Sequence, residues 1–411
     1  MTMDNVLDVL AERGMVKQIT HEQALREELS RDGASCYIGM DPTADSLHAG
    51  HLLIIMAMMH LQRCGNRVVC LLGGGTAMVG DPSGKSEMRQ MLTRETIEKN
   101  ARKIYAQVGR YLETEGDEVV FLNNADWLAE LNYIDFLREY GKHFSVNRML
   151  AAESYKMRME TGLSFIEFNY QLLQAYDFLH LYRTHGCRVQ MGGDDQWGNI
   201  VAGTDLIRRV EGAEAEGMTW PLLETASGEK MGKTAQGAVW LDPKRTSPYD
   251  FYQYWINVDD RDVEKFLGFF TLLPMKEVRE LCQEGGAALR SAKGRLAFEA
   301  TRISHGDEAA QEAQQAAKAL FVRGDSDVEG APSSECPVSQ LEEGWSLLDA
   351  MVETGLAQSK GAARRLVRGG GAYVNGERVS DEMRALTKDD VQEGRILLRS
   401  GKKAYHRLDV V

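Results

Sequence analysis

Four short stretches of the sequence carry residue types that are suited to binding phosphates or sugars. The first, VGDPSGKS (residues 79–86), follows an apolar run and includes Lys85. A P-loop of the form G-x-x-x-x-G-K-[ST] wraps phosphates in backbone N–H groups. Here Val79 stands where the first glycine belongs, and Pro82 lacks an N–H donor. The spacing therefore argues against an ATP-binding P-loop, and a turn with an incidental lysine stays open.

The second stretch, LHAGHLL, brings two histidines to the start of a predicted helix. His48 and His51 are three residues apart, so they share one face of the first turn. Gly50 between them costs about 1 kcal/mol relative to alanine in a helix, which suggests close approach of another group. A helix N-terminus favours anions such as phosphate. Two surface histidines remain the simpler interpretation, and a zinc pair has no third ligand nearby.

The other two stretches add cations and carboxylates. GEKMGKTA holds Lys230, Lys233 and Thr234 in a glycine-containing loop, although such loops are often just solvated turns. GGDDQWGN follows a predicted strand, and carboxylates at a strand end commonly hold ribose hydroxyls. Each stretch alone is a weak indication of a binding site.

The elements that would position these stretches alternate between strands and helices. Candidate strands, rich in Val, Ile, Leu and Tyr, cover residues 34–40, 67–73, 118–124 and 187–193. A helix between the first two, with Ser46 as N-cap and Gly65 as C-cap, completes a parallel strand–helix–strand unit. Residues 127–185 are mostly helical by periodicity. The pattern predicts an α/β fold, a Rossmann-like parallel sheet with a helical insertion, over residues 1–225.

The rest of the chain is predicted to be helical and then to end in a small separate domain. A helical domain covers residues 226–322, and a stretch rich in Gly, Ser and Pro predicts a linker over 323–344. Residues 345–411 contain two helices and a hairpin that turns at Asn375-Gly376, an α+β domain. This domain has twelve Lys and Arg against nine Asp and Glu, whereas the whole chain carries −13. A basic domain on an acidic body suggests a polyanionic partner, although chance variation is the simpler explanation.

Composition narrows the class of protein. Apolar residues make up 43% and charged residues 27%, which is ordinary for a globular protein. The longest apolar run, residues 52–59, falls far short of the roughly 20 residues of a membrane span, and the N-terminus does not resemble a secretory signal. Six scattered cysteines without a Cys-x-x-Cys pair predict free thiols in a reducing compartment. We expect a cytoplasmic protein without a membrane anchor, disulfides or a protein-bound metal.

Together the stretches resemble one known family. YIGMDPTADSLHAGHL, FNYQLLQAYDF, GGDDQWGNI and KMGKT, in this order, are similar to the signatures of bacterial-type tyrosyl-tRNA synthetases, which are class I aminoacyl-tRNA synthetases. The resemblance runs from about Asn5 to the C-terminus, where the last domain is similar to a small RNA-binding fold shared with a ribosomal protein. It implies an aminoacyl-tRNA ligase that forms tyrosyl-adenylate from tyrosine and ATP, releases diphosphate, and transfers tyrosine to the 3′ end of its tRNA.

The resemblance also implies an ATP site, with Mg²⁺ carried by the phosphates. Residues expected to act in catalysis, mainly at the phosphates, are Thr43, His48, His51, Lys85, Arg89, Lys230, Lys233 and Thr234. Residues expected to contact ATP elsewhere are Gly39, Asp41, Gly50, Gly193, Asp195 and Met231. Because the substrate carboxylate is already a nucleophile, the chemistry needs no general base, and positioning and electrostatic stabilisation should account for catalysis.

The tyrosine pocket follows from the same resemblance. Tyr37 and Asp177 would bind the phenol, Asp81, Tyr170 and Gln174 the ammonium group, and Gln196 the carboxylate. Tyr170, Gln174 and Asp177 fall at i, i+4 and i+7 on one helix face, although an ordinary polar helix face has the same spacing. A buried hydroxyl partner left empty by phenylalanine is costly, which is the known basis of selectivity in tyrosyl-tRNA synthetases.

Three positions depart from the family pattern. Asp194 stands where serine is common, KMGKT replaces the usual KMSKS, and Ile54 occupies a position that is polar in some relatives, so a ribose contact there would be missing. The resemblance further implies a homodimer, with the interface in the helical insertion around residues 127–165. The residues expected to contact tRNA are Lys360, Arg364, Arg365, Arg368, Lys402 and Lys403, mostly through phosphates.

Three rival functions share some of these sequence features. A tryptophanyl-tRNA synthetase shares the fold, but Tyr37, Asp177 and the appended RNA-binding domain argue against it. A P-loop kinase fails on the spacing of its loop. A non-catalytic RNA-binding relative is disfavoured because His48, His51 and both loop lysines are present.

Overall fold

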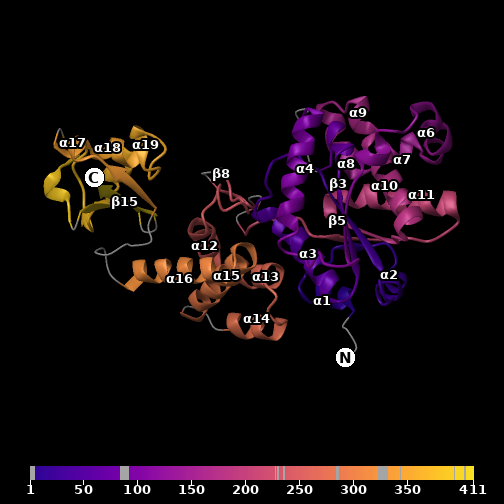
Figure 1. Cartoon of the computed structure of the whole chain (residues 1–411), viewed down its shortest axis with the longest axis horizontal. Helices are drawn as coiled ribbons and strands as arrows, with labels where there is room; N and C mark the ends of the chain where they lie inside the picture. The colour runs from indigo at the N-terminus through magenta and orange to yellow at the C-terminus, as the bar shows by residue number, and fades with distance from the viewer. Residues whose placement is uncertain are drawn as a thin grey trace. The chain divides into compact units, whose positions relative to one another are not determined.

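The computed structural model of the chain describes residues 5–83, 92–226, 228, 231–234, 237–283, 287–322, 332–342, 344–392, 394–401 and 404–411. Two compact units emerge, Met1–His305 and Gly306–Val411 (Figure 1). The finer boundaries expected after residues 225 and 322 stay predictions. Among the described helices, none is both long and apolar enough to cross a membrane.

The larger unit is built on a six-stranded sheet of order β1-β6-β5-β2-β3-β4. Its strands are β1 (Gln18–Ile19), β2 (Ser35–Met40), β3 (Arg67–Leu72), β4 (Val119–Asn123), β5 (Val189–Gly193) and β6 (Glu216–Trp220). Strands β2 to β6 pair in parallel, and β1 joins β6 antiparallel at the edge. This confirms the predicted Rossmann-like parallel sheet, and the four predicted strands correspond to β2, β3, β4 and β5.

The strand order reverses at β2. Strands β3 and β4 lie on one side of it, and β5 and β6 lie on the other. Ligands of open α/β sheets bind outside the carboxyl ends of the strands at such a reversal. The helices that connect the strands around this point are α3 (Leu52–Arg63), α4 (Arg94–Val108), α10 (Tyr170–His185) and α11 (Trp197–Glu211), and Figure 1 shows them packed around the sheet.

Helices fill the chain between β4 and β5, as the periodicity predicted. Before α10 these are α5 (Ala125–Leu128), α6 (Tyr133–Glu139), α7 (Val146–Leu150), α8 (Glu153–Thr161) and α9 (Phe165–Phe168). The remaining elements of this unit are α1 (Val6–Glu12), α2 (Glu22–Leu29), β7 (Lys233–Thr234), β8 (Gly237–Ala238), α12 (Pro248–Ile256), α13 (Val263–Phe270), α14 (Met275–Cys282) and α15 (Ala287–His305).

The helix expected from Ser46 to Gly65 begins differently. A 3-10 turn, η1 (Ala49–His51), leads into α3, and its N-cap is His48, whose Nδ1 accepts from the Gly50 N–H at 3.1 Å. The His48 N–H donates to His51 Nδ1 at 3.2 Å, so two histidines form a capping box. Ser46 was therefore the wrong N-cap, because its hydroxyl donates to the Leu47 carbonyl instead. Gly65 follows the helix with a φ of 80°, as a C-terminal glycine should.

The smaller unit contains a five-stranded sheet of order β12-β11-β14-β15-β9. Its elements are α16 (Asp307–Val322), β9 (Ser333–Cys336), α17 (Val338–Glu342), β10 (Trp345–Ser346), α18 (Leu347–Glu353), α19 (Lys360–Arg368), β11 (Ala372–Val374), β12 (Glu377–Arg378), β13 (Ala385–Leu386), β14 (Arg395–Ser400) and β15 (Ala404–Val410). Asn375 and Gly376 have φ of 48° and 84° between β11 and β12, which confirms the predicted hairpin turn.

The structure corrects the predicted linker over residues 323–344. Strand β9 pairs in parallel with β15, and α17 follows it, so residues 333–342 belong to the folded domain. Of the four residues of β9 only Cys336 is buried. An edge strand with three exposed residues shows no apolar alternation, which is why its composition resembled a linker.

Candidate active site

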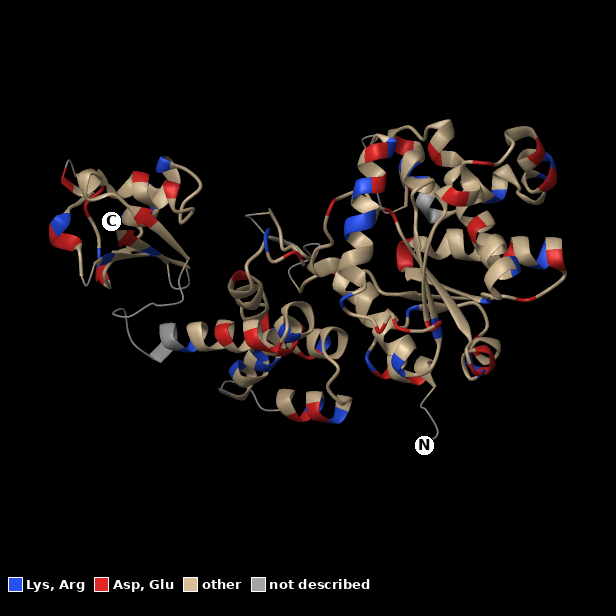
Figure 2. Cartoon of the chain, viewed as in Figure 1, with Lys and Arg blue, Asp and Glu red and all other residues tan. Residues whose placement is uncertain are grey.

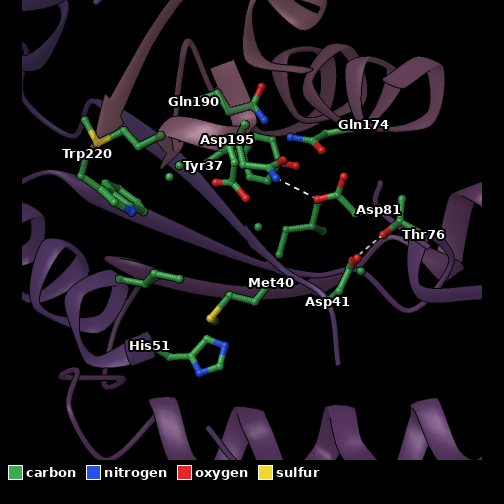
Figure 3. Close-up of a pocket in the computed structure, with 18 of the residues that line it drawn as sticks. Tyr37, Met40, Asp41, His51, Thr76, Asp81, Gln174, Gln190, Asp195 and Trp220 are labelled. Atoms are coloured by element: carbon green, nitrogen blue, oxygen red, sulfur yellow. Dashed lines mark hydrogen bonds between the residues drawn. The ribbon is translucent and has the colours of Figure 1, made fainter. Parts of the chain in front are cut away.

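A cavity of about 300 Å³ lies at the carboxyl ends of the central strands of the larger unit. Figure 3 shows Tyr37, Gln174 and Asp81 around one end of it and Met40 with His51 at the other. Neither Lys nor Arg is among its described lining residues, whereas Asp41, Asp81, Asp177 and Asp195 all line it. A cavity walled by carboxylates favours a ligand group with a positive charge.

Asp177 is almost fully buried in the wall of this cavity, with 1% of its surface exposed. Its two carboxylate oxygens accept from Asn124 Nδ2 at 2.9 Å and from Trp127 Nε1 at 2.8 Å. Burial raises the pKa of Asp177 to about 7, and the charge of Asp41 adds to the rise, while the two hydrogen bonds oppose it. Tyr37 is also buried, which together with Asp177 raises the pKa of its phenol well above the usual value.

Asp81 belongs to a second buried network on the same cavity. Its carboxylate accepts from Gln196 Nε2 at 2.8 Å and from the Ser83 N–H at 2.9 Å. Asn199 on α11 donates to Gln174 Oε1 and Gln196 Oε1, both at 3.1 Å. Burial first, and then Asp41, raises the pKa of Asp81. The network fixes a carboxylate and two amide side chains around one end of the cavity.

Asp41 connects the two ends of the cavity. It follows β2 and accepts from Thr76 Oγ1 at 2.9 Å and from Tyr170 Oη at 3.1 Å. A β-carbon built on Gly73 would lie 2.0 Å from Asp41 Oδ1, so this position must be glycine for Asp41 to sit where it does. Asp41 therefore connects β2, the turn after β3 and helix α10.

The histidine turn and the Lys-Met-Gly-Lys-Thr loop lie against each other. A β-carbon on Gly50 would lie 3.1 Å from the Met231 carbonyl oxygen, and one on Gly232 (φ of 82°) would lie 2.7 Å from Gly50 N. A side chain at residue 232 would therefore collide with the Gly50 backbone, and one at residue 50 would crowd the Met231 carbonyl. Since Nδ1 of His48 and of His51 accepts a hydrogen bond, each neutral ring carries its proton on Nε2, a donor suited to phosphate oxygens.

The cavity brings together most of the predicted site residues. The lining includes Tyr37, Gly39, Asp41, Thr43, Gly50, His51, Asp81, Tyr170, Gln174, Asp177, Gly193, Asp195 and Gln196. His48 and Met231 lie beside Gly50 without being among the lining residues. Lys85, Arg89, Lys230, Lys402 and Lys403 lie outside the described residues, and of Lys233 and Thr234 only the backbone is described, as strand β7.

The structure shows where two of the residues that depart from the family pattern lie. Asp194 faces the sheet edge, where its Oδ1 accepts from Gln18 Nε2 at 2.6 Å and from Thr219 Oγ1 at 2.9 Å. It is not among the lining residues, whereas its neighbour Asp195 is. Ile54 does line the cavity, with an apolar side chain.

Several lining or supporting residues were missed from the sequence. Thr76, Asn124 and Gln190 line the cavity, and Trp127 and Asn199 hold the side chains that do. Asn124 immediately follows β4, so its place at a strand end was a usable signal. Gln190 lies within β5, opposite Tyr37 on β2, and only the pairing of those strands brings it to the site.

Family models match both units of the chain. Residues 30–322 match the class I tRNA synthetases of the tryptophan and tyrosine type, and residues 327–408 match the SYY-like C-terminal domain of tyrosine–tRNA ligases. The fold and the site thus define a class I aminoacyl-tRNA synthetase.

Curated relatives show which amino acid the family of this chain uses. The tyrosine–tRNA ligase of Desulfosudis oleivorans is 53% identical over 99% of both chains, and that of Caldanaerobacter subterraneus is 53% identical over 98% of this chain and 99% of its own. The chain belongs to the tyrosine–tRNA ligase family. The tryptophanyl, P-loop kinase and non-catalytic alternatives are set aside accordingly.

Solved structures agree with this. A C-terminally truncated mitochondrial tyrosyl-tRNA synthetase of Aspergillus nidulans matches with a TM-score of 0.68 at 30% identity, covering 77% of this chain and 94% of that one. An Archaeoglobus fulgidus tyrosyl-tRNA synthetase complexed with L-tyrosine shares the fold, with a TM-score of 0.57 at 16% identity over 76% of this chain and all of that one.

Proposed function

We propose how the residues of this chain divide the work of the tyrosine–tRNA ligase reaction. The family reaction uses ATP to activate tyrosine and then transfers tyrosine to tRNA. The observation that carries the proposal is that buried Tyr37 and buried Asp177 line the same acidic cavity. A phenol placed there would donate to Asp177, and the substrate ammonium group would lie among Asp81, Tyr170 and Gln174.

Charge supports this orientation of tyrosine. Asp81 and Asp41 line the cavity, and each is a better partner for an ammonium group than for a phosphate. Gln196 donates to Asp81 through Nε2, so it lies beside both the ammonium position and the expected position of the substrate carboxylate. Tyrosine would therefore lie with its carboxylate toward the side of the cavity where Thr43 and His51 are found.

Phosphates would lie at the histidine turn. Thr43, His48 and His51 would contact the phosphates of ATP in its magnesium complex, and Asp195, close to Gly193, would hold the ribose. Lys85, Arg89, Lys230, Lys233 and Thr234 would act on the leaving diphosphate, by the resemblance alone. The attacking carboxylate is already ionised, so these groups would catalyse by positioning and by stabilising charge.

A homodimer through the helical insertion is part of the proposal. Large apolar side chains are exposed there, with exposed fractions of 71% for Phe165, 67% for Ile134 and 55% for Val146. Exposed apolar clusters commonly mark interfaces between proteins. Phe165→Asp should shift the protein to a monomer in analytical ultracentrifugation, and an unchanged sedimentation coefficient would rule this interface out.

The smaller unit would bind tRNA through Lys360, Arg364, Arg365, Arg368, Lys402 and Lys403. Three of these cations already have acidic partners, since Lys360 pairs with Asp349 at 2.5 Å and Glu382 pairs with both Arg364 and Arg368. Figure 2 shows basic and acidic segments side by side on this unit. The phosphates of tRNA would have to displace these acidic partners.

A cytoplasmic location is also part of the proposal, because the reaction proposed for this protein needs both ATP and tRNA.

The deciding experiment is ATP–diphosphate exchange driven by single amino acids. We expect exchange with tyrosine and at least a thousandfold lower kcat/KM with phenylalanine or tryptophan, because neither can donate the hydrogen bond that a phenol would give to Asp177. Equal exchange with tryptophan would overturn the assignment of the pocket.

A further inference from the structure

The segment that leads to His48 and contains Thr43 is held in place by side chains that are not among the lining residues of the cavity. Residues 42–47, which include Thr43 and lead into His48, form no helix or strand. Their backbone is held instead by two buried amides on α4. Asn100 Nδ2 donates to the Pro42 carbonyl at 3.1 Å, and Gln107 Oε1 accepts from the Leu47 N–H at 2.8 Å.

Gln107 makes the more complete contact. Its Nε2 donates to Ser46 Oγ at 2.9 Å, and Ser46 in turn donates to the Leu47 carbonyl at 3.0 Å. Gln107 is 6% exposed and Ser46 is 2% exposed, so water does not readily replace these bonds. The amide therefore binds the two residues immediately before His48.

The opposite side of the segment is tied to the chain that follows the Lys-Met-Gly-Lys-Thr loop. The Leu241 N–H donates to the Leu47 carbonyl at 2.9 Å, and the Ala49 N–H donates to the Val239 carbonyl at 2.8 Å. His48 thus sits between an anchor to α4 and an anchor to residues 239–241. Loss of the Gln107 contacts leaves Leu47 bonded to Leu241, while Asn100 and Lys103 of α4 still hold Pro42 and Asp45.

We propose that Gln107 is a positioning residue for the activation step: it fixes the backbone before His48, and so the place of the His48 ring at the ATP phosphates. Asn100 does the same for Thr43 through Pro42. The inference rests on the proposed role of Thr43 and His48. It predicts that Gln107 affects the rate of adenylate formation and not the binding of tyrosine, whose expected contacts come from β2, α10, Asp81 and Gln196.

A matched control exists in the same unit. Gln62 on α3 makes the same two-sided contact to a backbone elsewhere, donating to the Glu113 carbonyl at 2.7 Å and accepting from the Glu113 N–H at 3.0 Å. Gln62→Leu removes a pair of hydrogen bonds to one backbone residue at a more exposed position, and Gln62 is not among the lining residues of the cavity. This variant measures how much the loss of two hydrogen bonds away from the site slows adenylate formation.

The experiment measures single-turnover tyrosyl-adenylate formation in the full-length protein. Gln107→Leu should slow this step by about 10- to 100-fold, as expected for a misplaced catalytic group, with the tyrosine Kd changed less than twofold. Gln62→Leu should change the rate less than threefold. A rate loss in Gln107→Leu no larger than in Gln62→Leu, or an equal loss of tyrosine affinity, would overturn the proposal.

A double-mutant cycle separates this inference from the proposed role of His48. In a His48→Ala background, Gln107→Leu should lose most of its effect, because both changes act through one ring. If His48→Ala slows activation and the two effects simply multiply, only the positioning role fails. If His48→Ala leaves the rate unchanged, the phosphate site itself is wrongly placed.

Discussion

Two carboxylates, one in each unit of this protein, have different hydrogen-bond partners and pKa values shifted in opposite directions. Asp177, in the cavity of the larger unit, receives hydrogen bonds from the neutral side chains of Asn124 and Trp127, and burial raises its pKa to about 7. Glu382, on the surface of the smaller unit, is held by Arg368 and Arg364, and hydrogen bonding to Arg368 lowers its pKa. Burial beside neutral donors leaves a carboxylate that can accept a hydrogen bond from a ligand, whereas pairing with arginines on the surface leaves a carboxylate that a competing anion must displace.

The largest expected effect is at Asp177. Asp177→Asn places an amide N–H₂ against Asn124 or Trp127, both of which are donors, and it removes the charged acceptor for the phenol. We expect kcat/KM for tyrosine to fall about 100-fold, since a hydrogen bond to a charged group contributes about 1.5–3 kcal/mol. The KM for ATP should stay within twofold in the exchange assay, and a parallel loss for ATP would contradict the role given to Asp177.

A second expected effect is on pH dependence. In the tyrosine-free protein the pKa of Asp177 is raised from 3.8 to about 7, so the stability that its protonated form contributes is lost as pH rises through about 7. A phenol donates best to the ionised form, so tyrosine should bind roughly tenfold more tightly at pH 8 than at pH 6.

Phenylalanine separates this effect from that of Asp81, because it has the ammonium group but lacks the phenol. The ratio of the two dissociation constants, measured by calorimetry from pH 5.5 to 8.5, isolates the contribution of Asp177. A ratio that does not vary with pH would show that Asp177 is ionised throughout this range.

A smaller effect is expected at Glu382. Glu382→Gln releases Arg364 and Arg368, so the KM for tRNA in aminoacylation should fall about two- to fivefold at low salt and converge with the wild type at high salt. Asp389→Asn removes the same charge from an exposed position of the same unit and is the matched control. Equal gains in both variants would mean that net charge, and not release of the arginines, sets tRNA affinity.

The smallest effect on activity is expected at Asp194. Asp194→Ser removes an acceptor from Gln18 and Thr219, which should cost about 1 kcal/mol of stability and lower Tm by a few degrees. The kinetic constants of Asp194→Ser for tyrosine and ATP should stay within twofold of the wild type, whereas Asp195→Ser should weaken the binding of ATP. Were Asp194→Ser to raise the KM for ATP as much, the carboxylate of Asp194 would belong to the site after all.

Much of the fold was predictable because it depends on local patterns. Short apolar runs bounded by Gly, Asp and Asn identified β2 to β5, and Asn375-Gly376 identified a hairpin. The three-residue face of α10 was also readable, since i, i+4 and i+7 share a face whatever surrounds the helix. These features follow from backbone geometry within one segment. The edge strand β9 was missed because its exposed residues show no alternation.

What the sequence by itself determined is which side chains can reach a common edge: the strand ends carry Asp41 and Asp195, and one helix face carries Tyr170, Gln174 and Asp177. Only the tertiary structure decided how each is used. Asn124 and Trp127 reach Asp177 from 53 and 50 positions away, and Gln107 reaches Leu47 from 60 positions away. Asp194 is not among the residues that line the cavity, whereas Asp195 is. Pairing, burial and pKa depend on neighbours brought together by strand order, which no single segment encodes.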